Sequence, residues 1–395
     1  MKLFYAPLRA LEQKFIEYVL SLQTGPEQGL LVLCPSERVA AHLQRLLLKH
    51  RPIIGNITFK TLGQLMGELD KQSGVWRKPL LPNDCFHDYL LKNLLLRPEL
   101  NRYPANTGVI GALKASLRDL ADAMVDPEIL HEHWITLPEF SMEDEQAHLK
   151  WLIEVYRAYL EQMEQIPQYR SYAAYFDEVI RLAENSAYLH GFKQILVYGF
   201  YEFTGRQLEL FHTLRRNYPL SVFWAYMQHP AFSFGKKFFE SNILGTAQEV
   251  YPLEQDWQKL AAKEAAEDLF SGKEFTAEIP QGLKIISVAD VEAELFFVAK
   301  EILRLHEEQG IAYEDMAVTA RSMEPYKNLL PAVFEQNFIA LNASFSNFLS
   351  STSLGVFLHN LLGLLRKGFP REEVLAVVQS PYFKQKNKWR YLITE

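Results

Sequence analysis

The chain has 395 residues, of which 48% are hydrophobic and 23% are charged, and its formal net charge at pH 7 is -7. This composition excludes a disordered chain and predicts a globular protein of two or three domains. The acidic balance argues against a uniformly basic nucleic-acid-binding coat, while leaving room for a local basic groove. Because Cys34 and Cys85 are the only cysteines, these residues form neither a disulfide framework nor a four-thiolate metal site.

The N-terminal sequence, MKLFYAPLRALEQKF, lacks the long apolar stretch of a signal peptide. Nowhere does the chain contain about eighteen consecutive apolar residues, the length that a membrane-spanning helix needs. We therefore predict a soluble protein of the reducing cytoplasm, without a membrane partner.

Residues 1–78 are predicted to form the first part of an α/β domain. Short apolar runs typical of buried strands occur at 2–5, 29–34 and 56–59, and each is followed by apolar residues at helical spacing. Strand, turn and helix in this order are typical of the start of a parallel sheet.

Polar residues follow the second and third of these strands. Pro35 and Ser36 come directly after the second, and Thr58, Phe59 and Thr61 lie at the end of the third. Ser36 and Thr61 are good helix caps, which is the simpler explanation for their presence. Hydroxyls and an aromatic ring at a strand end would also suit phosphates and a stacked base. Phe59 is equally compatible with a place in the core.

The turn after the first strand lacks the features of a nucleotide-binding P-loop. Such a loop has the pattern G-x-x-x-x-G-K-[ST], because backbone amides wrap the phosphates and the lysine reaches them. Here the turn, residues 6–10, reads APLRA; it contains no glycine, and its proline lacks an amide donor. The glycine–lysine pairs at 235–236 and 272–273 lack both the spacing and the hydroxyl. We therefore predict no working Walker A site.

Residues 79–190 are predicted to form a helical insertion between strands of the α/β domain. Strand signals nearly vanish there, and apolar residues recur at three- and four-residue spacing between proline-containing breaks. His131-Glu132-His133 resembles a metal site in composition. Residues i and i+2 point to different faces of a helix, however, and the His-Glu-x-x-His spacing is missing, so we predict no metal site.

Residues 191–280 return to alternating strand and helix and are predicted to complete the α/β domain. Strands are expected at 195–197 and 220–224, which implies a parallel sheet with right-handed crossovers. Ligands bind at the carboxyl ends of strands in such sheets, so residues 198–204 would lie where a ligand-binding site is expected. The alternative is one more core strand with an aromatic loop packed over its end.

A helix and linker over 254–278 lead to a predicted domain boundary at 279–282. Residues 281–395 are expected to start a second α/β domain, with strands at 283–288 and 316–319 and a C-terminal helical region. Two or three strands are too few for a complete sheet, so we expect the chain to be a fragment of a longer protein. Helices are predicted at 291–307, where Asp290 is the N-cap, and at 326–334.

Four short segments carry a resemblance to known proteins. The strongest is GFYEFT (199–204), which is similar to a strand-end motif in which an aspartate precedes Gly-Phe-x-x-Phe-Thr; the others are DVEAE (290–294), IAYEDMAVTAR (311–321) and VLAVVQSPYF (374–383). Their order resembles the N-terminal, helicase-like half of the AddB subunit of bacterial AddAB helicase-nucleases, and more distantly the RecB, RecC and UvrD families. The resemblance implies a P-loop-NTPase-like, superfamily 1 helicase-like parallel sheet with a large helical insertion.

The resemblance also implies functional residues. Pro35 and Ser36 match a strand-end segment that touches single-stranded DNA in related helicases, and the next such motif is matched by Thr58, Phe59 and Thr61. Arg321 matches an arginine that reaches the nucleotide phosphates in the active relatives, and we expect it to be either structural or a remnant here. Candidate basic contacts to DNA phosphates are Arg38, Arg45, Arg206, Lys236, Lys237 and Arg321, although an ordinary solvated face explains each of them about as well.

Two departures from the family motifs bear on catalysis. Residues 6–10 replace the Walker lysine loop, and Tyr198 stands where the family has an acidic residue. Magnesium needs a hard oxygen ligand, and tyrosine is a poor one at neutral pH. The resemblance therefore points to a helicase fold that has lost ATP hydrolysis. The family's nuclease, with its divalent metal and its iron–sulfur cluster, would lie beyond residue 395, and we expect no cofactor in this chain.

The leading hypothesis is an ATPase-inactive, DNA-binding portion of an AddB-type exonuclease subunit that acts in double-strand break repair and recombination. It would bind single-stranded or tailed duplex DNA alongside an active helicase-nuclease partner subunit. The alternative is a scaffold that docks an active helicase subunit without touching DNA, for which 19 tyrosines and 26 phenylalanines could supply interface anchors. Salt-dependent DNA binding separates the two hypotheses.

Overall fold

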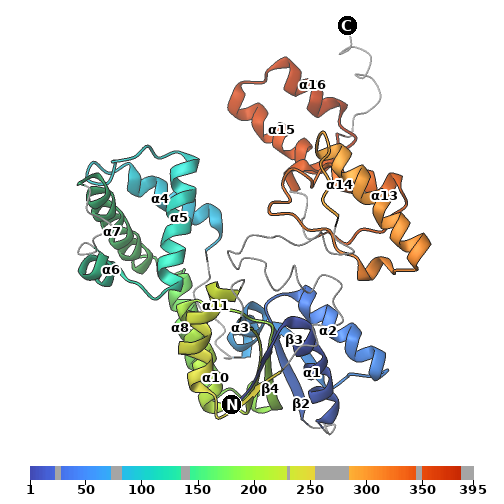
Figure 1. Ribbon diagram of the computed structural model, residues 1–395. Coiled ribbons are helices and arrows are strands. Elements are labelled where there is room, and N and C mark those ends of the chain that lie inside the picture. The colour runs from blue at the N-terminus through green and yellow to red at the C-terminus, as the bar shows by residue number, and fades with distance from the viewer. Residues whose placement is uncertain are drawn as a thin grey trace. The chain divides into compact units, whose positions relative to one another are not determined.

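The computed structural model describes residues 1–22, 28–72, 82–134, 143–228, 232–253, 284–343 and 349–383. The chain divides into two compact units, Met1–Leu283 and Lys284–Glu395 (Figure 1). The helix and linker predicted at 254–278, and the boundary predicted at 279–282, lie outside the described residues.

The first unit is built on a six-stranded sheet in which every neighbouring pair is parallel. Its strand order is β3-β2-β4-β5-β1-β6, so the predicted parallel α/β sheet is confirmed. The strands are β1 (Lys2–Ala6), β2 (Gly29–Cys34), β3 (Ile57–Thr61), β4 (Phe192–Tyr198), β5 (Leu220–Ala225) and β6 (Glu249–Pro252).

Burial explains why the central strands were readily predicted and one edge strand was not. β2 and β5 are almost continuously buried, because helices cover both of their faces, and their sequences are nearly unbroken apolar runs. β6 is exposed at all four residues and ends in a proline, and its sequence shows neither an apolar run nor an alternating pattern. β6 was therefore not predicted from the sequence.

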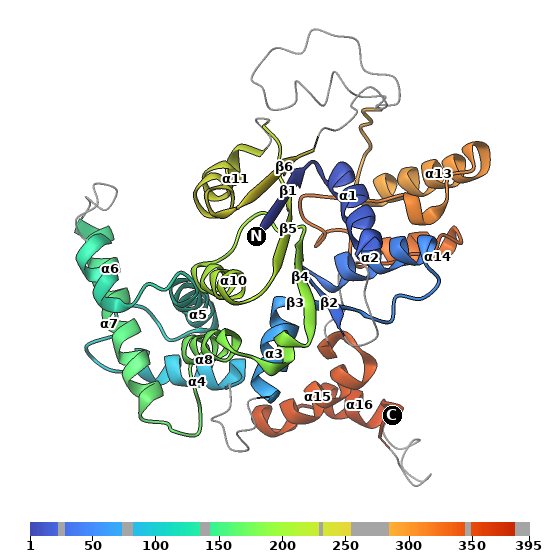
Figure 2. The same ribbon diagram turned by 90° about the horizontal axis from the view of Figure 1, so that it is seen from below.

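Helices cover the two faces of the sheet, as Figure 2 shows. One face packs on α1 (Leu8–Ser21) and α2 (Glu37–His50), whose buried side chains join those of β1, β2, β4 and β5 in one hydrophobic cluster. The other face packs on α8 (Tyr172–Glu184) and α10 (Gly205–Asn217) in a second cluster. That second face also receives α3 (Leu62–Gln72), α9 (Ala187–His190) and α11 (Ser233–Phe238).

The predicted helical insertion contains a group of helices with a hydrophobic core of its own. We call this group the helical lobe; it consists of α4 (Asp84–Leu95), α5 (Thr107–Asp122), α6 (Pro127–Trp134) and α7 (Glu143–Glu164). Its core contains Leu94, Leu117 and Trp151, and the Trp151 indole nitrogen donates to the Leu100 carbonyl at 2.8 Å. The next helix, α8, instead shares its core with the sheet.

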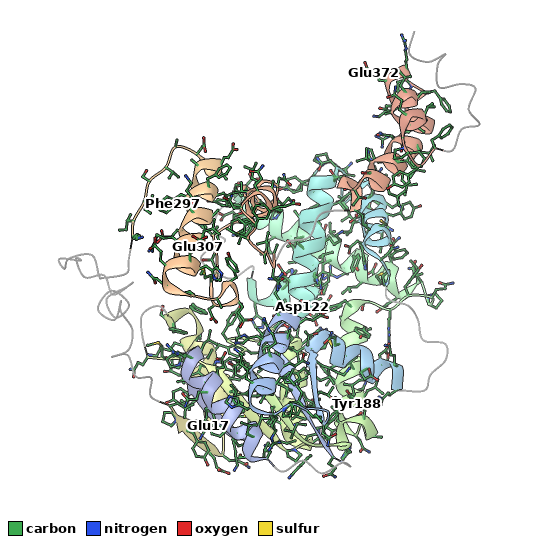
Figure 3. The ribbon with its side chains drawn as sticks, turned by 90° about the vertical axis from the view of Figure 1, so that its right-hand side faces the viewer. Glu17, Asp122, Tyr188, Phe297, Glu307 and Glu372 are labelled. Atoms are coloured by element: carbon green, nitrogen blue, oxygen red, sulfur yellow. The ribbon has the colours of Figure 1, made fainter. Side chains whose placement is uncertain are left out.

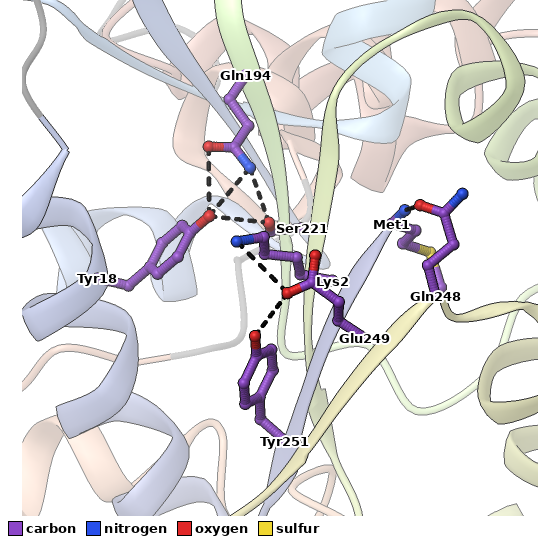
Figure 4. A network of polar contacts seen from close by, with 8 residues as sticks. All are labelled: Met1, Lys2, Tyr18, Gln194, Ser221, Gln248, Glu249 and Tyr251. Atoms are coloured by element: carbon purple, nitrogen blue, oxygen red, sulfur yellow. Dashed lines mark hydrogen bonds and ion pairs between the residues drawn. The ribbon is translucent and has the colours of Figure 1, made fainter.

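A polar network fastens the amino edge of the sheet (Figure 4). The Gln194 amide of β4 donates to the Ser221 hydroxyl of β5 at 2.7 Å and to the Tyr18 hydroxyl of α1 at 3.1 Å. Ser221 is fully buried, so its hydroxyl needs these partners. At the edge strand, Glu249 pairs with Lys2 and accepts from the Tyr251 hydroxyl at 2.6 Å.

The second unit is helical in the part that the structure describes. It contains α13 (Val291–Gln309), α14 (Leu329–Gln336), α15 (Ser353–Lys367) and α16 (Arg371–Gln379). Asp290 caps α13, as predicted, by accepting from the Ala293 amide at 2.8 Å.

The strands predicted in this unit at 283–288 and 316–319 are not formed among the described residues. Residues 284–288 and 316–319 pair with no other strand there. Most of their apolar side chains are exposed, Ile285 at 78% and Val318 at 38%, whereas Met316 packs against the hydrophobic cluster of α13 and α14. A strand is stabilised by ladder hydrogen bonds and by burial of a face, and neither is supplied in the described part of this unit.

Candidate nucleic-acid interface

The carboxyl edge of the sheet gathers loops that are far apart in the sequence. Because all six strands are parallel, the segments that follow β1, β2, β3, β4 and β5 all leave from this edge. At residue 199, the chain turns with a positive φ of 77°, which favours glycine, and a Cβ built there would lie 3.9 Å from the Pro35 Cδ. The loops after β2 and β4 therefore lie next to each other.

The predicted residues at the end of β2 are open to solvent. Pro35 is exposed and Ser36 is half-buried, with the Ser36 Oγ accepting from the Val39 amide at 3.4 Å as the cap of α2. A capping hydroxyl uses its oxygen as acceptor and keeps its proton for a second partner. Ser36 can therefore cap the helix and still donate to a phosphate.

The three residues predicted as a site at the end of β3 lie in different environments. Thr61 caps α3: its Oγ1 accepts from the Gln64 amide at 3.2 Å, and its own amide donates to the Gln64 side chain at 2.9 Å. Thr58 is half-buried. Phe59 packs against the hydrophobic cluster beneath α2, which favours the core interpretation of this ring. Thr61 and Ser36 thus reach the same edge, whereas Phe59 contributes mainly to the core.

The segment GFYEFT separates into core and surface residues. Phe200 and Phe203 are each 7% exposed, and Phe203 stacks on Phe211 with ring centroids 5.2 Å apart. Tyr201 is 51% exposed and meets the 66% exposed ring of Phe234 edge-on at 6.0 Å. Two of the three aromatic rings in this segment therefore serve packing, and one remains for binding.

Tyr201, Phe232 and Phe234 form a group of rings that we call the aromatic edge. Phe232 stacks on Phe234 with centroids 6.5 Å apart; Phe232 is the N-cap residue of α11, and Phe234 lies in its first turn. Lys236 and Lys237 are exposed on the same helix. Phe234 was not among the predicted site residues; an aromatic pair directly before two lysines, F-S-F-G-K-K, is the sequence signal that could have found it.

Tyr198 is a core residue. Its side chain is 4% exposed and packs edge-on against Phe15 of α1, with centroids 4.9 Å apart, and beside Phe223 of β5. Burial raises the pKa of its phenol above the usual value, so the group stays neutral at physiological pH. A neutral phenol in an aromatic cluster does not provide the oxygen anion that magnesium prefers.

The start of α1 does not form a phosphate cradle. Pro7 is the N-cap residue and makes no side-chain capping hydrogen bond, and Leu8 beside it is 59% exposed. The helix N-terminus thus presents an apolar side chain where a P-loop would present glycine amides and a lysine.

The structure places Arg206, a predicted DNA contact, inside the first unit and not on its surface. Its side chain is buried, with the residue 8% exposed, and its donors are directed at protein acceptors. The Nε donates to the Ala121 carbonyl at 2.7 Å, and Nη1 donates to the Ala173 carbonyl at 3.2 Å and pairs with the Asp177 carboxylate. A guanidinium engaged in this way, with its side chain 10% exposed, leaves little of its surface to a phosphate.

The other predicted arginines lie on the surface of their units. Arg38 and Arg45 are exposed on α2 in the first unit, and Arg321 is exposed in the second unit. Their roles in binding DNA or nucleotide stay predictions.

A cavity of about 430 Å³ lies between the helical lobe and α8. Both basic side chains in its lining are already engaged: Lys114 donates to Asp88 at 2.7 Å, and the Arg118 guanidinium lies 5.2 Å from the centre of the Tyr172 ring. His87 is bonded to the Tyr159 hydroxyl at 2.9 Å. These contacts are accounted for within the fold, so we assign no ligand to this cavity.

Across the described residues, no three His, Cys, Asp or Glu side chains are placed to hold a metal ion together. Cys34 is buried and Cys85 is exposed, and both are free thiols. Within the same residues, no helix combines the length and apolar character that crossing a membrane requires.

The fold and the site define a class of protein. A parallel sheet covered on both faces, with β5 between the first strand and the strand of the GFYEFT motif and with a helical insertion before β4, is P-loop-NTPase-like. No family model matches the chain.

Three curated relatives are each named as the AddB subunit of an ATP-dependent helicase/deoxyribonuclease. The chain is 22% identical over 358 residues to the protein of Natranaerobius thermophilus, covering 79% of this chain and 29% of that protein. It is 24% identical over 309 residues to the Bacillus subtilis protein, covering 73% and 24% respectively. It is 26% identical over 153 residues to the Oenococcus oeni protein, covering 38% and 12%. These homologues confirm the resemblance to AddB, and the chain spans between about a quarter and a third of the length of the first two.

Proposed function

We propose that this chain is the DNA-binding, helicase-like portion of a DNA-repair helicase-nuclease and that it does not hydrolyse ATP. The observation that carries the proposal is the make-up of the carboxyl edge. This edge carries the capping hydroxyls of Ser36 and Thr61, and it carries the exposed rings of Tyr201 and Phe234, which contact each other. Hydroxyls with aromatic faces are the groups that hold phosphates and stack bases of a single strand.

In this function, single-stranded DNA would be held by two kinds of contact. The hydroxyls, with Lys236 and Lys237, would contact the sugar-phosphate backbone and fix its register. The rings of Tyr201 and Phe234 would stack on bases without selecting their sequence. The net charge of -7 limits the positive field to such local groups, so binding would depend on a few phosphate contacts.

Two features support the loss of ATP hydrolysis. The loop after β1 lacks glycine and lysine, and the strand-end position of the family's acidic residue is taken by Tyr198, which is buried among aromatic rings. Arg321 would then be a remnant of a nucleotide site. Calorimetry with ATP and magnesium is expected to give no binding heat, and saturable binding would refute this part of the proposal.

The relatives' name describes one subunit of an ATP-dependent helicase/deoxyribonuclease, which implies for them a second subunit. For this chain we propose an active helicase-nuclease partner that moves the DNA. A nuclease with its divalent metal and iron–sulfur cluster would belong to sequence beyond residue 395, and we assign none of that chemistry to the residues described above.

Titration of labelled single-stranded and tailed duplex DNA over a series of salt concentrations tests the proposal. We expect measurable affinity at low salt and a steep decline as salt rises, because bound phosphates release counterions when they are neutralised. Absence of binding at low salt would refute DNA binding.

That negative result would favour the scaffold alternative. α15 in the second unit exposes apolar side chains of the kind found at protein interfaces, among them Leu354, Leu358 and Leu362. Under the alternative, this surface would bind a helicase subunit directly.

A further inference from the structure

Arg206 lies at a junction of three helices. It is the second residue of α10, and its guanidinium bonds to the carbonyl of Ala121, near the end of α5, and to Ala173 and Asp177 of α8. α5 belongs to the helical lobe and has its buried side chains in the core of that lobe, whereas α8 and α10 belong to the core of the sheet. The Arg206 side chain thus forms hydrogen bonds both to the helical lobe and to a helix that packs on the sheet.

The end of α5 is well suited to receive this cation. The last carbonyls of a helix carry partial negative charge, and Ala121 is in the last turn of α5. The adjacent Asp122, labelled in Figure 3, has a raised pKa because of its burial, opposed by the charges of Arg118 and Arg206. At this helix end the half-buried Asp122 carboxylate and the buried Arg206 guanidinium each lower the free-energy cost of keeping the other charged.

The residue before Arg206 makes the closest approach at the same junction. A Cβ built on Gly205 would lie 3.0 Å from the Ala123 carbonyl oxygen and 3.1 Å from its carbon, both of which are backbone atoms that cannot turn aside. Gly205 therefore allows the start of α10 to touch the end of α5. Thr204 and Gln207 form a capping box that fixes this start of the helix.

The junction also adjoins the proposed binding edge. Thr204, Gly205 and Arg206 directly follow the loop that carries Tyr201, so the lobe is attached at the end of the segment that presents this ring. We propose that Arg206 is a positioning residue: its guanidinium clamps the helical lobe to the β4–α10 loop and thereby holds the lobe beside the carboxyl edge. The consequence for DNA affinity rests on the proposed function, whereas the clamp itself does not.

Hydrogen–deuterium exchange of the whole chain tests the clamp. Lysine cannot reproduce the fork of donors that reaches three acceptors, so Arg206→Lys is expected to speed exchange of the amides at the end of α5 by about tenfold. Gly205→Ala perturbs the same junction by placing a Cβ against the Ala123 carbonyl. It is expected to speed exchange of the same amides. Arg216→Lys is the matched control, because Arg216 lies on the same helix with its side chain 57% exposed, and its exchange pattern should equal that of the unmodified chain.

DNA titration of the same variants distinguishes positioning from phosphate contact. A positioning role predicts that Arg206→Lys weakens affinity while the slope of log affinity against log salt stays unchanged. A phosphate contact predicts a slope smaller by about 1 with normal exchange at α5, which would overturn the proposal. Exchange at α5 that is unchanged in both Arg206→Lys and Gly205→Ala would also overturn it. If the unmodified chain binds no DNA, the proposed function fails, and accelerated exchange in both variants still upholds the clamp.

Discussion

At the scale of single residues, burial decides which of the polar side chains can act on a ligand. Tyr198 and Arg206 both lie near the carboxyl edge, yet Tyr198 is packed among rings and Arg206 is bonded to three protein acceptors. Tyr201, a few residues from each, is half exposed. The binding groups of this edge are therefore a small subset of those that the sequence motif contains.

Replacing Tyr198 by aspartate tests whether the acidic position alone can restore a nucleotide site. We expect Tyr198→Asp to lower the free energy of unfolding by about 3 kcal/mol or more, because a carboxylate would be buried beside Phe15 and Phe223. Calorimetry should still detect no ATP binding, since the loop at 6–10 is unchanged. Tyr198→Phe is the control and should alter stability by less than about 1 kcal/mol. Recovery of ATP binding in the aspartate variant would contradict the expectation.

We expect the ionisation of Asp122 to make the free energy of unfolding depend on pH. Burial raises its pKa, so the native state binds the proton more tightly than the unfolded state does. Its stabilising contribution is therefore present below the unfolded pKa and is lost as pH rises through the folded pKa. At pH 7, Asp122→Asn should raise the free energy of unfolding by about 1 kcal/mol, because it removes a buried carboxylate whose Oδ1 lacks a hydrogen-bond partner.

The gain from Asp122→Asn should disappear below about pH 4, where both side chains are neutral. Denaturant unfolding of the two proteins at both pH values gives the comparison. An equal difference in stability at the two pH values would show that ionisation of Asp122 plays no part.

At the scale of elements, one loop between a strand and a helix serves packing, presentation and attachment. Phe200 and Phe203 anchor it in the core, Tyr201 is presented to solvent, and Gly205 with Arg206 meets the helical lobe. The exposed residues Tyr201 and Glu202 lie between the two buried rings, so the chain is anchored on both sides of the exposed ring. This division of roles explains how a short motif can contribute two rings to the core and still leave a third ring exposed for binding.

The aromatic edge predicts separable effects on DNA binding. Tyr201→Ala and Phe234→Ala should each weaken binding by about 1–3 kcal/mol, without changing the salt slope, because stacking involves no counterion release. Lys236→Ala and Lys237→Ala should each reduce the slope by about 1. Titrations at several salt concentrations measure both quantities.

Ile53→Ala is the matched control for these variants. Ile53 is 81% exposed and precedes β3, so it lies towards the amino edge of the sheet. Its replacement should leave affinity unchanged. Equal losses in the Ile53 and Phe234 variants would mean that the aromatic edge is not the binding surface.

At the scale of the whole molecule, the first unit contains separate hydrophobic cores. Two clusters cover the faces of the sheet, and a third fills the helical lobe. The contacts that bridge the lobe to the sheet include those of Arg206 and the Arg118–Tyr172 pair. Because the helical lobe and the sheet have separate cores and few bridging contacts, each can unfold locally without the other.

Leu117→Ala tests this separation. Leu117 is 5% exposed in the core of the helical lobe, and its truncation should cost about 2–5 kcal/mol there. Amides of α4, α5 and α7 should exchange faster by hydrogen–deuterium exchange, while those of β2 and β4 keep their protection. Leu43→Ala, in the cluster beneath α2, should give the reverse pattern. Uniform acceleration in both variants would indicate a single cooperative unit.

Much of the local structure was predictable because the signals are local. The apolar run at 29–34, the caps Ser36, Thr61 and Asp290, and the helical spacing of the insertion all appear as predicted. β6 escaped prediction, and so did the lack of pairing of 316–319 within the part of the chain that the structure describes, because strand formation depends on neighbours distant in the sequence.

The sequence by itself determined the alternation of strands and helices, the lack of a P-loop, the position of Tyr198 and the resemblance to AddB, because these depend on residue types and their spacing. Only the tertiary structure decided the strand order, the burial of Arg206 and the meeting of Tyr201 with Phe234. Those features arise from contacts between segments far apart in the chain, whose geometry is set by packing of the whole sheet and its helices. Whether a polar side chain faces solvent or another helix is therefore settled only once the fold has formed.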